Sequence, residues 1–166
     1  MIAKYKGNYY LYACKKKAEG LLAVDDKDNY LITRKKEKSS KEFQFEDNRF
    51  FVKKTRIEEL TDVFKIVYIV EYDSGVPNLL KKWETTSIKN GIIKLTYGMG
   101  FLPGWDGEDK FVCTKSVNKE DINSGIIRMI YTKKDGVVFE KPHVEEKTVG
   151  IEELIYAYNF FADENI

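Results

Sequence analysis

The chain has few of the residues that most often provide crosslinks, metal ligands or catalytic groups. Its 166 residues include two cysteines, one histidine and three prolines. Two cysteines are too few for a disulfide framework, and with a single histidine they leave no zinc-ligand spacing. We therefore expect a reducing compartment, no metal and no cofactor.

Long apolar runs and a strong charge of either sign are also missing. No apolar run approaches the ~18 residues of a membrane helix, and the N-terminal segment MIAKYKGNYYLYAC lacks the apolar core and cleavage site of a signal peptide. The formal charge is +1, whereas proteins that bind nucleic acids normally have a clear Lys/Arg excess. We expect a cytoplasmic chain that starts at Met1 and has no membrane contact, with nucleic acid disfavoured as its main partner.

What the chain does contain is a succession of short strand signals. Hydrophobic residues make up 43% of it and charged residues 33%, a balance typical of a globular protein. Runs rich in β-branched and aromatic residues predict strands at 9–14, 21–24, 30–33, 49–52, 63–72, 91–97, 110–113 and 126–132. Asn90-Gly91 and Asp135-Gly136 predict type I′ hairpins, because both central residues of such a turn need positive φ.

Four short blocks recur in the same order along the chain. YACKKK (12–17) and LITRKK (31–36) are echoed 99 residues later by FVCTKS and IYTKKD. Phe45-Glu46 and IEEL (57–60) are echoed 94 residues later by Phe139-Glu140 and by IEEL at 151–154. Such internal similarity predicts a tandem duplication. The alternative is chance similarity within a Lys-rich β chain.

The expected fold is mainly β, with two tandem small Src-homology-like barrel repeats that each contain a short helix. The first repeat covers 1–75, a linker covers 76–84, and the second repeat covers 85–166 with an inserted loop at 98–110. The alternative is a single antiparallel β-sandwich with a C-terminal helix. The segment 151–166 fits either a helical stripe or one face of a strand, and the repeat favours a short helix followed by a strand.

Local sequence signals assign a structural role, and not a catalytic one, to most of the residues that could react. Thr55 and Glu58 fit a capping box at the first short helix. Acidic neighbours and a proline place His143 in a predicted exposed loop, and Cys14 and Cys113 are expected to pack inside strands as small apolar groups. We predict no catalytic residue and a protein that is not an enzyme. An enzyme with a cryptic site is the last alternative.

Two basic clusters suggest a different class of function. Lys15–Lys17 and Arg34–Lys36 lie at the ends of predicted strands, with tyrosines nearby. Small barrels can bind single-stranded nucleic acids through such a mixture of cations and aromatic rings. Lysines at strand ends also solvate turns and protect exposed sheet edges. A nucleic-acid-binding tandem β-barrel is therefore the alternative function.

The least strand-like stretch is GMGFLPGWDGEDK, residues 98–110. Its four glycines and one proline predict an exposed loop. A tryptophan within a polar rim is a frequent hot spot of protein interfaces, so this loop supplies the candidate binding residues Phe101, Leu102, Trp105, Asp106, Glu108 and Asp109. The alternative is that Trp105 folds back to close an open barrel end. The carboxylates lack the spacing of a calcium loop.

Several segments together give the chain a resemblance to a known class of proteins. They are MIAKYKGNYY, YLITRKK, EYDSGVPNLLKKW, GIIKLTYGMGFLPGWDGEDK and YTKKDG. The chain resembles the diverse bacterial immunity proteins that neutralise toxins of contact-dependent and polymorphic secretion systems. These proteins share no common site, so no binding residue can be transferred. The resemblance implies a cytosolic, non-enzymatic protein that binds one cognate toxin, and we expect it to be a monomer.

Overall fold

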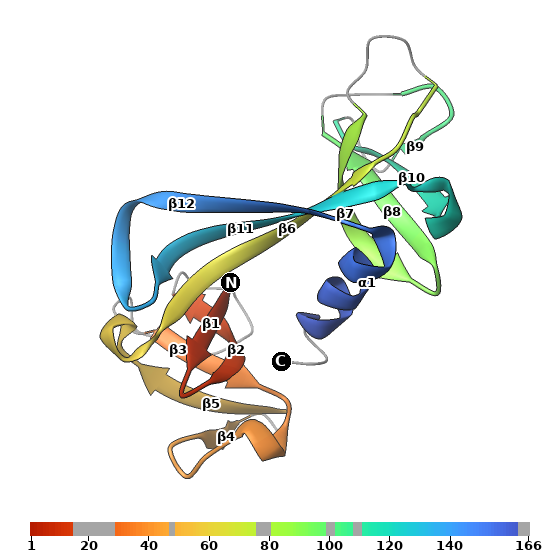
Figure 1. Cartoon of the computed structure of the whole chain (residues 1–166). Helices are drawn as coiled ribbons and strands as arrows, with labels where there is room; N and C mark the ends of the chain where they lie inside the picture. The colour runs from red at the N-terminus through yellow and green to blue at the C-terminus, as the bar shows by residue number, and fades with distance from the viewer. Residues whose placement is uncertain (15–28, 47–48, 76–80, 99–101, 108–110, 163–166) are drawn as a thin grey trace. The chain divides into compact units, whose positions relative to one another are not determined.

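The structure is a computed structural model that describes residues 1–14, 29–46, 49–75, 81–98, 102–107 and 111–162 (Figure 1). Its strands are β1 (Ile2–Tyr5), β2 (Asn8–Cys14), β3 (Asn29–Thr33), β4 (Gln44–Glu46), β5 (Phe50–Thr55), β6 (Asp62–Glu71), β7 (Lys82–Lys89), β8 (Ile92–Tyr97), β9 (Asp106–Gly107), β10 (Cys113–Asn118), β11 (Ser124–Lys134) and β12 (Val137–Val149). Three 3₁₀ turns, η1 (Lys36–Lys38), η2 (Ile57–Glu59) and η3 (Lys119–Asp121), and one α-helix, α1 (Ile151–Phe160), complete the described elements.

The chain forms two compact units. Unit 1 comprises Met1–Lys65, Ile130–Val144 and Phe160–Ile166, and unit 2 comprises Ile66–Met129 and Glu145–Asn159. The unit boundaries fall inside β6, β11, β12 and α1. Each unit therefore draws on both halves of the sequence. The division into repeats at 1–75 and 85–166 stays a prediction about the origin of the sequence.

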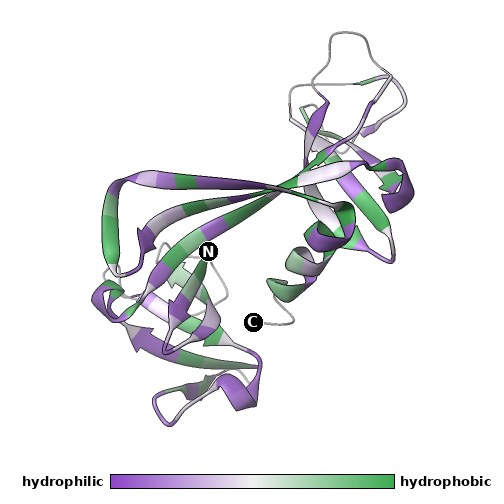
Figure 2. Cartoon of the chain, viewed as in Figure 1, coloured by the Kyte–Doolittle hydropathy of each residue, from purple (hydrophilic) through white to green (hydrophobic). Residues whose placement is uncertain are grey.

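Unit 1 is built on the antiparallel strand order β4-β5-β3-β2-β1-β6. The turn between β1 and β2 has Lys6 at φ 47° and Gly7 at φ 82°, the conformation of a tight hairpin. Apolar and polar residues alternate along the long strands (Figure 2), so that one face of each strand can be buried. The core of unit 1 consists of Ile2, Ala3, Tyr5, Tyr10, Tyr12, Leu31, Phe43, Val52, Leu60, Val63, Phe64 and Tyr131.

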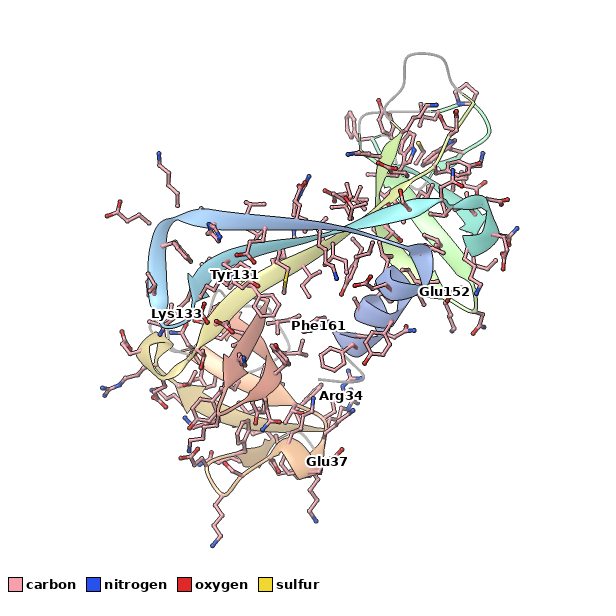
Figure 3. All side chains as sticks on the ribbon, viewed as in Figure 1. Arg34, Glu37, Tyr131, Lys133, Glu152 and Phe161 are labelled. Carbon is pink, nitrogen blue, oxygen red and sulfur yellow. The ribbon has the colours of Figure 1, made fainter. Side chains whose placement is uncertain are left out.

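A buried ammonium group fixes the end of η2 in unit 1. Lys133, labelled in Figure 3, is only 2% exposed. Its Nζ donates hydrogen bonds to Ile57 O at 2.7 Å and to Glu58 O at 3.2 Å. These carbonyls belong to a short helical turn, where Ile57 O also accepts the backbone N–H of Leu60 at 3.2 Å and a positive charge is favourable. Lys133 thus serves as the cap of η2.

Unit 2 continues the sheet in the order β6-β7-β8-β10-β9. The turn between β7 and β8 has Asn90 at φ 52° and Gly91 at φ 76°. Strands and helix enclose a core that includes Tyr68, Val70, Trp83, Ile88, Ile93, Leu95, Cys113, Val117, Ile122 and Leu154. The helix packs on this core through Leu154, which is fully buried.

Both predicted type I′ hairpins are confirmed. Asp135 and Gly136 join β11 to β12 with φ values of 49° and 82°, as Asn90 and Gly91 join β7 to β8. The predicted strands match β2, β3, β5, β6, β8 and β11 to within a few residues. The predicted strand at 21–24 lies outside the described residues. The one predicted at 110–113 is displaced, because β10 begins at Cys113.

The C-terminal prediction is partly wrong. The expected helix is present as the ten-residue α1, but no strand follows it in the described residues, which end at 162. The helical stripe decides the outcome, because Leu154 is buried and Ile151, Ile155 and Tyr158 pack against the core of unit 2. The predicted capping box also shifts by one residue. Glu59, and not Glu58, accepts the backbone N–H of Arg56, at 3.1 Å.

The fold class is therefore mainly β, with an open antiparallel sheet and a C-terminal helix. The described ladders do not establish closure into two tandem barrels, which stays a prediction. The alternative of a β-sandwich with a C-terminal helix is compatible with this arrangement. None of the described helices is long and apolar enough to cross a membrane.

Candidate interaction surface

The apolar residues of the 98–110 loop that the structure describes are buried. Leu102 and Trp105 are 6% and 5% exposed and belong to the core of unit 2. The ring of Trp105 lies 4.6 Å from that of Trp83, at an angle of 42°. Trp105 N donates to Leu102 O at 3.1 Å, which turns the chain back on itself. Both side chains are thus part of the core of unit 2.

The acidic part of this loop is only partly described. Asp106 is exposed on the short strand β9 and lies opposite Thr114 of β10. Phe101, Glu108 and Asp109 lie outside the described residues. The role of the six loop residues in binding a partner stays a prediction. Asp106 is the described member with an exposed side chain.

His143 lies on a strand and not in the predicted loop. It belongs to β12, and its exposed imidazole stacks on Phe139 with ring centroids 5.1 Å apart. Tyr131 of β11 is 6.3 Å away. Proline is tolerated in a strand that lies at a sheet edge, which explains why Pro142 does not interrupt β12. Aromatic contact orients this histidine.

Of the two cysteines, Cys113 is buried in the core of unit 2, in agreement with the structural role predicted for it. Cys14 is the last residue of β2. Among the described residues, no group of three or more His, Cys, Asp or Glu side chains is placed to hold a metal ion.

A polar cluster surrounds the buried Tyr5 in unit 1. The Tyr5 hydroxyl donates to Glu42 Oε2 at 2.8 Å, and Lys53 Nζ lies 4.6 Å from the centre of its ring. Lys53 also pairs with Glu59 at 2.9 Å. Hydrogen bonds from Lys53 and from the Arg56 N–H hold the pKa of Glu59 below its usual value. These contacts join η2 to the sheet. A structural role therefore accounts for the polar cluster.

Several exposed apolar side chains lie close together in the sequence of β12. Nine large apolar side chains among the described residues are exposed, and three of them fall within residues 137–144. Val137, Val138 and Val144 are 58%, 57% and 51% exposed. We call these three residues the β12 patch. Sequence reasoning missed it, because Val137-Val138 indicates a strand but does not show which side chains of that strand other elements cover.

The β12 patch belongs to a long strand with little cover. Most of the thirteen residues of β12 are exposed, and Val149 is the only buried one. The strand pairs with β11 in the described sheet. Charged residues flank the patch, including Glu140, Lys141 and Glu145. Because side chains alternate along a strand, Val138 and Val144 lie on one face and Val137 on the other, and Val138 and Val144 are about 20 Å apart.

Comparison with protein-family models, with curated proteins and with solved structures finds no match to this chain in any of the three.

Proposed function

We propose that the protein is a non-enzymatic immunity protein that binds and neutralises a cognate bacterial toxin domain in the cytoplasm, acting as a monomer. The resemblance of its segments to such proteins suggests the class. The observation that carries the proposal is the exposure of β12, whose Val138 and Val144 lie on one face of the strand and are open to a partner. These two side chains would supply apolar contacts to the toxin.

The arrangement of β12 favours contact through side chains. Edge strands can pair with a strand of a partner, but Pro142 has no backbone N–H to donate. Glu140, Lys141 and Glu145 add charges that also disfavour strand pairing. Val138 and Val144 therefore serve as the apolar contacts, and the charges around them select the partner.

The same proposal includes the finer architecture, in which each of the repeats 1–75 and 85–166 is a small bent barrel. In unit 1, β6 returns to pair with β1 after the run β1, β2, β3 and β5. The segment IEEL begins η2 (Ile57–Glu59) in the first repeat and α1 (Ile151–Phe160) in the second. A helical element at the same place in both copies supports a relation between the repeats.

The experiment uses the product of the gene adjacent to this one. We expect the two proteins to copurify in a fixed ratio, and coexpression to protect cells from the toxin. The double variant Val138→Asp/Val144→Asp should weaken the complex by about 2 kcal/mol or more, because it places a charge at each apolar contact. Phe45→Ser is the matched control, since Phe45 is 56% exposed on β4, outside the patch.

Protection and copurification decide this proposal. An isolated gene with no toxin neighbour, together with no protection by coexpression, would overturn it. Equal weakening by the patch variant and the control would remove the patch from the interface. Trp105→Ala is unsuitable as a test, because loss of a buried tryptophan costs about 3–5 kcal/mol of folding stability.

Binding of single-stranded nucleic acid is the second candidate function. Unit 1 contains 19 Lys/Arg and 15 Asp/Glu, a formal charge of +4. The Arg34 guanidinium lies 5.2 Å from the Phe50 ring. Cations beside aromatic rings are typical of surfaces that bind single strands. Binding to labelled oligonucleotides should then fall steeply as salt increases, and absence of binding at low salt would exclude it.

A further inference from the structure

A groove in unit 2 brings together residues from β8, β10, η3 and α1 and from the turn before β8. Its cavity is about 370 Å³, and its walls are the turn between β7 and β8, the end of β10 with η3, and α1. We call it the α1 groove. The residues that line it are Asn90, Gly91, Ile92, Asn118, Lys119, Glu120, Glu152 and Ile155.

Two contacts made by Lys119 hold the walls together. Its backbone N–H donates to Gly91 O at 2.8 Å, which joins η3 to the hairpin turn. Its ammonium group pairs with Glu152 of α1, labelled in Figure 3, at 2.6 Å. The hydrogen bond and the negative charge of Glu152 raise the pKa of Lys119. The groove is thus formed before any partner arrives, which lowers the entropy cost of binding.

The floor of the groove is apolar, and its unpaired polar groups are mostly acceptors. Ile92 is 42% exposed, and Ile155 packs against the core of unit 2. In the part of the chain that the structure describes, the Glu120 carboxylate makes no hydrogen bond or ion pair, and the side-chain amides of Asn90 and Asn118 make no hydrogen bond.

The charges of the groove favour a cationic guest. Lys119 and Glu152 neutralise one another, so Glu120 leaves an excess negative charge. Unit 2 as a whole contains 9 Lys/Arg and 12 Asp/Glu, a formal charge of −3. A surface of this sign attracts positively charged partners.

We propose that the α1 groove binds an arginine side chain of a protein or peptide partner. The aliphatic stem would lie on Ile92 and Ile155, since long cationic side chains cover apolar surface with their stems. The guanidinium group would donate hydrogen bonds to the Glu120 carboxylate and to the amide oxygens of Asn90 and Asn118. The α1 groove shares no residue with the β12 patch. Arginine binding to the groove can therefore be tested independently of toxin binding.

The test is a titration of the full chain with N-acetyl-arginine methylamide, followed by methyl NMR of labelled isoleucines. We expect the Ile92 and Ile155 resonances to shift with one saturation curve, and the neutral norleucine analogue to bind more weakly. Glu120→Gln should weaken binding about three-fold, the usual effect of a surface ion pair. Asn118→Asp should tighten it by a similar factor, because it adds a carboxylate to the groove.

Glu84→Gln is the matched control for charge. Glu84 is an exposed carboxylate of unit 2 and lies on β7 six positions before Asn90, ~20 Å along the strand. It should leave the binding unchanged. Absence of shifts at Ile92 and Ile155, equal binding of the neutral analogue, or equal effects of Glu84→Gln and Glu120→Gln would each overturn the proposal. Asn118→Asp keeps the test decisive if Glu120→Gln disturbs the fold, since unchanged binding would contradict the site.

Discussion

The two tryptophans of the chain pack against each other in unit 2 but differ in their indole N–H groups. Trp83 Nε1 donates to Tyr72 O at 2.9 Å. Trp105 Nε1 is buried and has no hydrogen-bond partner among the described residues. A buried donor without an acceptor costs about 1–3 kcal/mol. Trp105 therefore stabilises the core through its apolar ring, and the burial of its N–H group without an acceptor reduces that stabilisation.

This difference predicts unequal effects of one substitution at two sites. Trp83→Phe and Trp105→Phe remove similar ring volume, but only the first breaks a hydrogen bond. We expect Trp83→Phe to lower the free energy of unfolding by about 1–2 kcal/mol more than Trp105→Phe. Urea unfolding followed by far-UV circular dichroism measures both. Equal losses would show that the Trp83 hydrogen bond contributes nothing.

At the scale of elements, one glycine lets α1 approach the sheet. Gly125 lies in β11, and a Cβ added there would overlap Leu154 Cδ1 and lie 3.1 Å from Ile69 O. Leu154 is fully buried, and Ile69 O is backbone and cannot rotate away. Helix and strand are thus closer at this point than any side chain at position 125 would allow.

The contact predicts that Gly125→Ala destabilises unit 2. Overpacking of this kind costs about 1–3 kcal/mol, while Leu154→Ala alone should cost about 2–5 kcal/mol through the cavity it leaves. The double variant should be more stable than the sum of the single losses predicts, because the shorter side chain gives the new methyl group room. Gly150→Ala is the control, since no atom lies within 4 Å of the position that a Cβ would take there. Additive losses would contradict the contact.

At the scale of the whole molecule, the long strands contribute to both cores. Val63 and Phe64 of β6 are buried in unit 1, and Tyr68 and Val70 of the same strand belong to the core of unit 2. On β11, Ile126 is buried in unit 2 and Tyr131 in unit 1. Loss of either core would leave half of each strand without its packing.

This sharing predicts that the two units unfold together. Both tryptophans lie in unit 2, so tryptophan fluorescence reports on that unit, whereas far-UV circular dichroism reports on both. We expect the two urea transitions to coincide, which is the test of a two-state process. A fluorescence midpoint clearly separate from that of circular dichroism would show that the units unfold independently.

Local signals predicted the elements better than the site. The turns at Asn90-Gly91 and Asp135-Gly136 were predictable, because positive φ depends on the residues of the turn itself. The strand around His143 was not, since Pro142 and its charged neighbours are typical of loops. Pairing with β11 is a contact between strands and overrides that preference. The residues of the α1 groove come from separate segments, and no short stretch of sequence brings them together.

The sequence by itself determined a mainly β chain, its hairpin turns and the helical stripe of Ile151, Leu154 and Tyr158, because these depend on neighbouring residues and on periodicity. Tertiary structure alone decided the burial of Leu102 and Trp105 and the exposure of Val138. Burial depends on which distant residues cover a side chain, and Trp105 is covered by Trp83, on a separate strand. Glycine and proline content predicted the irregular chain at residues 102–105, but not the strand β9 that follows it or the burial of the tryptophan.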